Sequence, residues 1–197
     1  MSTSRPKASY HHGDLRHALI EAGLQLIEKN EFSKIGLREA ARAAKVSPAA
    51  PYRHFTNREA LLAAIAARGF EKLTVASEAV KQDDPGSPLN RLGHVYLDFA
   101  LANRNLFRLM FSGELRKQEP AELMDAAQRS IQSLQAAMRS TGTPNTREAS
   151  VGAWALVHGL AHLLVDEQLS PDLMEGAARD RLISTVTEIY GKGLRAR

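Results

Sequence analysis

Cysteine is absent from the 197 residues, which excludes disulfides, thiolate metal sites and cysteine nucleophiles. No uninterrupted apolar run reaches the roughly 18 residues that a membrane-spanning helix needs, and residues 1–14 contain no hydrophobic segment of a signal peptide. Hydrophobic residues make up 44% of the chain and charged residues 24%, which is ordinary for a folded, soluble domain. We therefore expect a cytoplasmic protein with no membrane partner.

Motifs of the common enzyme classes are also missing. The chain has no glycine-rich loop for phosphates and no nucleophile elbow. His158 and His162 have the i, i+4 spacing of two metal ligands on one helix face, but no obvious third ligand accompanies them. We therefore predict no catalytic site, no metal site and no cofactor, and a helical enzyme is the less favoured alternative.

The net charge of +4 is distributed unevenly. Residues 1–60 contain 10 Lys and Arg against 6 Asp and Glu, whereas residues 61–197 contain 16 of each sign. A basic part attached to a neutral, larger part indicates a polyanionic partner at one end of the molecule, since Lys and Arg neutralise phosphates. A solvated charged surface would explain the same excess.

Apolar residues recur at helical spacing along nearly the whole chain without period-two alternation, which predicts an all-α fold of about nine helices. Breaks are expected at 83–88, 142–144 and 170–171, where proline or glycine occurs. The first helix begins at Asp14, and the others are predicted at about 37–44, 47–54, 57–81, 89–102, 105–111, 121–139, 146–167 and 172–190. These helices divide into an N-terminal three-helix domain at 12–72 and a C-terminal helical domain at 84–197.

Two short helices joined by a tight turn and flanked by longer helices are typical of a helix-turn-helix, here at about 35–54. The second helix of such a motif enters the major groove of DNA. Small residues at its start allow a close approach to base edges, while longer polar side chains reach phosphates or a guanine edge. In this chain the second helix carries Ser47, Pro48, Ala49, Ala50, Tyr52, Arg53 and His54. Phe55 is expected to pack this helix onto the first one.

Four segments carry a family resemblance: residues 10–15 (YHHGDL), 41–47, 52–55 (YRHF) and 58–62 (REALL). In residue type and spacing they resemble the DNA-binding domain of the tetracycline-repressor (TetR) family. The resemblance implies DNA contacts by Ser47, Ala49, Ala50, Tyr52 and His54, with Arg38 and Arg58 on phosphates. It also implies a homodimeric repressor of transcription on double-stranded operator DNA, released by a small-molecule effector.

Three residues depart from the family's pattern. Gly36 stands where a Ser or Thr cap is usual, which costs a few tenths of a kcal/mol. Lys45 occupies a turn position where glycine is common, and a left-handed backbone there costs about 1 kcal/mol. Pro51 removes one N–H from the second helix of the motif. We therefore expect that helix to be short and slightly distorted.

The C-terminal helices have broad apolar faces that predict a two-fold dimer interface. Two glycines one heptad apart in the helix at 146–167 allow another helix to come close, and the helix at 172–190 carries a matching apolar stripe. The candidate interface residues are Gly152, Leu156, Gly159, Leu163, Leu182, Val186 and Ile189. Completion of the monomer core is the alternative role for these faces.

The opposite side of the helix at 146–167 carries Trp154 and His158, and residues 154–159 (WALVHG) resemble the Trp-His-Gly (WHG) subgroup of TetR-like C-terminal domains. An effector cavity with a mainly apolar wall is expected among the helices between 57 and 167. Asp98, four residues after His94, leaves a cationic ligand open. The candidate lining residues are His94, Phe99, Phe107, Met110, Met124, Trp154 and His158. A dimeric DNA-binding protein without an effector is the alternative.

Overall fold

The computed structural model describes residues 12–29, 32–81, 85–116, 120–140, 142 and 145–195. Every regular element in these ranges is helical, which confirms the predicted fold class. The α-helices are α1 (His12–Lys29), α2 (Leu37–Ala43), α3 (Arg58–Glu78), α4 (Pro88–Ala102), α5 (Arg104–Met110), α6 (Gly113–Arg116), α7 (Ala121–Ser140), α8 (Thr146–Val165), α9 (Pro171–Met174) and α10 (Gly176–Arg195). The 3-10 helices are η1 (Phe32–Lys34) and η2 (Pro51–Arg53).

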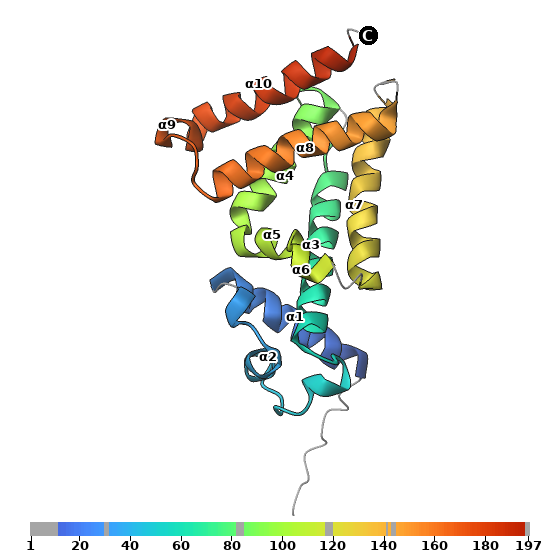
Figure 1. Cartoon of the computed structure of the whole chain (residues 1–197), viewed down its shortest axis with the longest axis vertical. Helices are drawn as coiled ribbons and strands as arrows, with labels where there is room; N and C mark the ends of the chain where they lie inside the picture. Colours follow the sequence, from blue (N-terminus) through green and yellow to red (C-terminus); the bar gives the residue numbers. More distant parts are fainter. Residues whose placement is uncertain are drawn as a thin grey trace, which may run out of the picture.

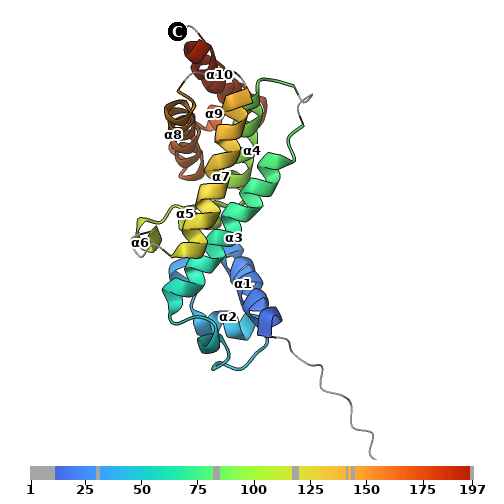
Figure 2. The same ribbon diagram turned by 90° about the vertical axis from the view of Figure 1, so that its right-hand side faces the viewer.

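One long helix connects the two ends of the molecule. In Figure 1, α1 and α2 lie at one end and α8 and α10 cross the other, while α3 runs between them; Figure 2 shows α7 alongside α3. Because an α-helix rises about 1.5 Å per residue, the 21 residues of α3 span roughly 30 Å. The N-terminal helices and the C-terminal half therefore share a structural element.

The start of α3 is defined by a side-chain cap. Asn57 has an extended backbone, and its side chain accepts a hydrogen bond of 2.8 Å from the Ala60 N–H, which the helix itself leaves without a partner. Residues 61–67 are all buried, because α1, α5 and α7 pack around this helix. The apolar run that follows the cap thus makes α3 a central helix.

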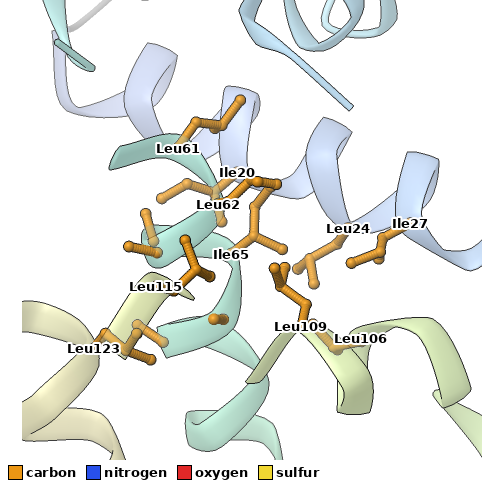
Figure 3. Packing of buried hydrophobic residues seen from close by; sticks show 14 of the residues in the cluster. Ile20, Leu24, Ile27, Leu61, Leu62, Ile65, Leu106, Leu109, Leu115 and Leu123 are labelled. Carbon is orange, nitrogen blue, oxygen red and sulfur yellow. The ribbon is translucent and has the colours of Figure 1, made fainter. Parts of the chain in front are cut away.

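The larger hydrophobic cluster combines residues from both predicted domains. Figure 3 shows side chains of α1, α3, α5, α6 and α7 meeting in one layer. Its labelled members are Ile20, Leu24, Ile27, Leu61, Leu62, Ile65, Leu106, Leu109, Leu115 and Leu123. A second cluster lies among α4, α5, α8 and α10 and includes Leu97, Phe107, Leu160, Leu164 and Ile183. The N-terminal helices and the first C-terminal helices are therefore packed on a common core.

Two details of the C-terminal half differ from the sequence prediction. The helix predicted at 172–190 is divided into α9 and α10, with Gly176 at φ +55°, a left-handed conformation that favours glycine. The short α6 was not predicted, since four residues carry too little periodicity to be recognised.

The prediction that no segment could cross a membrane requires a correction. α8 is long and apolar enough to do so by length and composition alone. In the structure it packs against α4, α7 and α10, and Ala153, Leu160 and Leu164 are buried in those contacts. The apolar character of α8 is explained by its position as a core helix.

Candidate nucleic-acid interface and ligand cavity

A tight turn follows α2. Lys45 has φ +57°, so this non-glycine residue does adopt the left-handed conformation considered from the sequence. The Val46 N–H donates to the Ala41 carbonyl at 3.0 Å, and the Lys45 N–H donates to the Arg42 carbonyl at 3.2 Å. These bonds close the end of α2 and turn the chain toward the next segment.

The segment predicted as an α-helix at 47–54 is a turn followed by the 3-10 helix η2. The Ala50 N–H donates to the Ser47 carbonyl at 3.0 Å, and the Arg53 N–H donates to the Ala50 carbonyl at 3.3 Å. Because Pro51 has no N–H, the Ser47 carbonyl cannot accept the i+4 bond of an α-helix and accepts from Ala50 instead. The expected short and distorted recognition helix is therefore confirmed, and the distortion is larger than predicted.

Most of the predicted DNA-contacting side chains face solvent at this end. Arg38, Ser47, Pro48, Ala49, Tyr52 and Arg53 are exposed, Tyr52 by 56%, and Ala50 is half-buried. Phe55 is buried as expected, with the Arg16 guanidinium 5.4 Å above its ring. His54 differs, because its Nε2 is buried and has no hydrogen-bond partner among the described residues. Nε2 of His54 is therefore not presented for a DNA contact.

Arg58, expected on a phosphate, has its guanidinium turned to the protein backbone. Nε donates to the Ile35 carbonyl at 2.7 Å and Nη2 donates to the Phe32 carbonyl at 2.6 Å. Both carbonyls lie in the segment between α1 and α2. Arg58 thus ties the start of α3 to the helix-turn-helix, and in this arrangement it positions the motif.

Arg58→Lys tests this positioning role. The lysine keeps the charge that a phosphate contact needs but cannot donate to both carbonyls from a rigid, planar group. We expect the free energy of unfolding in urea to fall by about 1 to 3 kcal/mol, the contribution of hydrogen bonds from a charged donor. Arg53→Lys, at an exposed site, should leave stability unchanged. Parent-like stability of Arg58→Lys would contradict the role.

A cavity of about 210 Å³ lies among α3, α4, α7 and α8. Met124 and Trp154 line it, as predicted. Its other described lining residues are Phe70, Leu73, Ser77, Leu89, Leu92, Gly93, Tyr96, Phe111, Ala127, Gln128, Ser130, Ile131, Leu134, Ala153 and Val157. The sequence analysis missed the α7 face, although residues 124, 127, 128, 131 and 134 have the spacing of one helical side.

Five predicted lining residues lie elsewhere. Phe107 and Met110 are fully buried in the two hydrophobic clusters, and Phe99 packs against the larger one. His94 Nε2 lies 3.1 Å from the Ser184 hydroxyl of α10, and His158 faces Tyr96. Phe107 and Met110 are buried, whereas His94, Phe99 and His158 are half-buried. Periodicity does not distinguish a helix side that meets a cavity from one that meets another helix.

Tyr96 and His158 form a hydrogen bond beside the cavity. The Tyr96 hydroxyl lies 2.8 Å from His158 Nδ1. Burial raises the pKa of Tyr96. Burial and, to a lesser degree, the neighbouring His162 lower the pKa of His158 to about 4. His158 is therefore neutral at pH 7 and shares a hydrogen bond through Nδ1 with the Tyr96 hydroxyl.

The lowered pKa of His158 predicts a loss of stability in acid. Unfolded His158 takes up its proton below its ordinary pKa of 6.5, whereas folded His158 takes it up only near 4. The unfolded state thus binds more protons in this window, and the free energy of unfolding should fall as the pH is lowered from 6.5 to 4. His158→Asn still offers Tyr96 an acceptor but does not titrate. Its free energy of unfolding, measured in urea, should therefore fall less steeply between pH 7 and 5. An identical fall in both proteins would contradict the assignment.

The predicted dimer residues have different surroundings in the single chain. Leu163 and Ile189 are exposed by 38% and 67%, and a Cβ built on Gly159 would meet nothing within 4 Å. A Cβ on Gly152 would instead collide with the Tyr190 hydroxyl, which donates to the Ala149 carbonyl at 2.9 Å. Gly152 therefore serves the contact between α8 and α10 within one chain. The remaining candidates, Leu156, Leu182 and Val186, are half-buried.

Two family models match the chain. Residues 19–65 match the model described as bacterial regulatory proteins, tetR family, and residues 89–186 match the tetracyclin repressor-like C-terminal domain. The chain belongs to the TetR family. It is accordingly a DNA-binding, helix-turn-helix regulator of transcription. The C-terminal match does not identify a subgroup of TetR-family proteins, so the WHG assignment stays a prediction.

Individual proteins resemble the chain in sequence or in fold. An uncharacterized HTH-type transcriptional regulator of Haemophilus influenzae is 32% identical over 98 residues, which is 48% of this chain and 48% of that protein. A solved structure of a protein with unknown function from Rhodococcus sp. RHA1 is 29% identical, with a TM-score of 0.78 over 95% of this chain and 99% of that one. The fatty acid degradation regulator FadR from Bacillus halodurans, 15% identical, shares the fold with a TM-score of 0.67 over 94% and 96% of the two chains.

Proposed function

We propose that this TetR-family chain is a homodimeric repressor that binds a pseudo-palindromic operator and dissociates from it when a small molecule fills the cavity. The main support for the proposal is that α3 contacts both the helix-turn-helix end and the cavity. Arg58 at its start bonds to carbonyls of the helix-turn-helix end, while Phe70, Leu73 and Ser77 farther along line the cavity. A change in the shape of the cavity therefore acts on the helix that holds the DNA-binding end.

The proposed DNA contacts follow from exposure and residue type. Small residues at 47–50 permit close approach to base edges, and Tyr52, Arg53 and Arg38 supply donors for phosphates or a guanine edge. We do not include His54 Nε2, which is buried, or Arg58, whose Nε and Nη2 bond to backbone carbonyls, among these contacts. Two such surfaces related by a dimer axis would read half-sites roughly 34 to 36 Å apart.

The dimer interface is proposed on the exposed apolar face of α8 and α10. Val151, Leu163 and Ile189 are exposed by 51%, 38% and 67% in the single chain, so a second subunit could cover them. The open space above Gly159 would admit a side chain of the partner's helix. Because a two-fold interface uses the same patch on both subunits, one apolar face of this kind suffices.

Hydrogen bonds through α5 link the proposed dimer helix to the DNA-binding end. Arg108 Nη2 donates to Asp166 Oδ1 at 2.7 Å and to the Val165 carbonyl at 3.2 Å, just at the end of α8. Asn105 Nδ2, on the same short helix, donates to the Ile27 carbonyl of α1 at 3.2 Å.

Release from the operator further requires that the ligand binds the non-operator arrangement of the dimer more tightly than the operator-binding arrangement. Equal binding to both arrangements would not shift the equilibrium between them.

Alanine substitutions at Tyr52 and Arg53 test the DNA contacts. Tyr52→Ala should weaken binding to all operator variants alike. Arg53→Ala, if Arg53 reads a guanine, should relax the preference at one base position by roughly 1 to 3 kcal/mol. Binding of both variants to a set of single-base operator mutants, measured by fluorescence anisotropy at fixed salt, separates these results. Equal losses at every position would make Arg53 a phosphate contact.

The rival proposal, a dimeric DNA-binding protein without an effector, differs in one observable. An effector must raise the thermal stability of the protein and at the same time weaken its operator affinity.

We further propose that the chain has no enzymatic activity and works in the cytoplasm, where its operator is. These two statements rest on membership of a family of transcription regulators.

A further inference from the structure

The wall of the cavity carries no charge among the described residues. Its lining consists of aliphatic, aromatic and small residues together with the neutral polar side chains of Ser77, Tyr96, Gln128, Ser130 and Trp154. Asp98, considered from the sequence as a partner for a cationic ligand, is exposed and lies 3.5 Å from Arg179 instead. A charged group inside the cavity would lose its hydration without gaining a partner of opposite sign, which is strongly unfavourable.

Aromatic rings form one side of the cavity. Phe70 and Phe111 contact each other edge to face at 5.2 Å between ring centroids, and the Trp154 ring lies 6.3 Å from that of Phe111. Tyr96 also lines the cavity, and its hydroxyl is hydrogen-bonded to His158. A flat aromatic ring is the ligand group that matches such a wall, because stacked and edge-to-face contacts add to the burial of apolar area.

The polar groups of the lining leave few hydrogen bonds for a ligand. The Tyr96 hydroxyl is hydrogen-bonded to His158, and the Ser77 hydroxyl donates to the Leu73 carbonyl at 2.9 Å. The side chains of Gln128 and Ser130, both on α7, have no hydrogen bond within the described part of the chain; Ser130 is half-buried and Gln128 is exposed. A ligand with its ring on the aromatic side can therefore place one neutral polar group toward α7.

The volume limits the size of the ligand. About 210 Å³ lies below the roughly 300 to 1,000 Å³ of most small-molecule sites, so one substituted ring or a pair of fused rings fits better than a long-chain compound. We propose that the effector is a small, uncharged aromatic compound with one neutral hydrogen-bonding group. This inference rests on the proposed function, in which the cavity is the effector site.

Three probes of nearly the same shape and different charge test the ligand class. They are 4-ethylbenzamide (neutral), 4-ethylbenzoate (anionic) and 4-ethylbenzamidine (cationic). Trp154 is the single tryptophan of the chain and lines the cavity, so its fluorescence reports occupancy directly. We expect saturable binding of the amide at least tenfold tighter than that of either ion. Tighter or equal binding of an ion, or no saturable change with the amide, would overturn the proposal.

Two matched substitutions on α7 test whether the amide binds in this cavity. Ala127→Leu fills the cavity from its lining and should weaken amide binding at least tenfold, whereas Ala136→Leu, exposed and outside the lining, should change it less than twofold. Ser130→Arg adds a cation to the lining and should reverse the preference toward the benzoate. Thermal melting of each variant verifies folding, and equal effects of the two leucine substitutions would contradict binding in this cavity. Operator release is measured separately, so amide binding that leaves operator affinity unchanged refutes the proposed function and not the ligand class.

Discussion

Leu163→Arg is expected to dissociate the dimer and to lower operator affinity about 100-fold or more. Leu163 is exposed on α8 in the single chain, so the arginine should leave the fold of each subunit intact. In the proposed dimer it would bury two unpaired cations at the two-fold interface, and an uncompensated buried charge costs about 3 to 5 kcal/mol. Loss of the dimer leaves each recognition segment to bind a half-site alone. Sedimentation and fluorescence anisotropy measure the two effects.

Val75→Arg is the matched control for this prediction. Val75 is 66% exposed on α3, outside the α8 and α10 face, and the added charge is the same. The control should remain dimeric and should bind the operator no worse than the parent, because the new cation stays hydrated. If Leu163→Arg also remains dimeric at micromolar concentration, the interface does not include this side of α8.

Phe107→Ala is expected to cost about 3 to 5 kcal/mol of unfolding free energy, the usual range for removing a fully buried aromatic ring. Phe107 is fully buried where α4, α5 and α8 meet. Its ring lies 5.8 Å from that of Tyr96, 5.0 Å from that of Phe111 and 5.6 Å from that of His158, between centroids. The alanine would leave a cavity that three rigid rings cannot collapse to fill.

Urea unfolding at a fixed protomer concentration measures this loss, since the stability of a dimer depends on concentration. Phe107→Leu should cost much less because most of the volume is retained. A loss below about 1 kcal/mol for Phe107→Ala would show that the aromatic cluster is loosely packed.

The helix-turn-helix was predictable because short-range chemistry determines it. Ser47 and Pro48 suit the cap and the first position of a short helix, Lys45 closes the preceding helix, and Pro51 prevents regular α-helical bonding within a few residues of itself. Each of these effects acts between residues close in the chain. The position and the distortion of the recognition segment therefore followed from the sequence, although its 3-10 geometry was recognised only in the structure.

The cavity was only partly predictable because its walls come from four helices far apart in the chain. Trp154 and Met124 were identified, but Phe107 and Met110 have equally apolar positions and pack into the core. The two glycines of α8 illustrate the same limit. Gly152 meets Tyr190 of α10 in the same chain, whereas Gly159 faces open space, and nothing in a seven-residue spacing distinguishes the two.

The sequence by itself determined the helical class, the TetR-type motif, the basic N-terminal part and the irregular recognition segment, since all of these depend on composition or on neighbours along the chain. The tertiary structure decided that Arg58 bonds to backbone carbonyls, that α3 connects the motif to the cavity, and that the cavity has an aromatic, uncharged wall. These features depend on which helix faces meet. Helical periodicity shows that a helix face is buried. Only the packing of the helices shows whether that face meets a cavity or another helix.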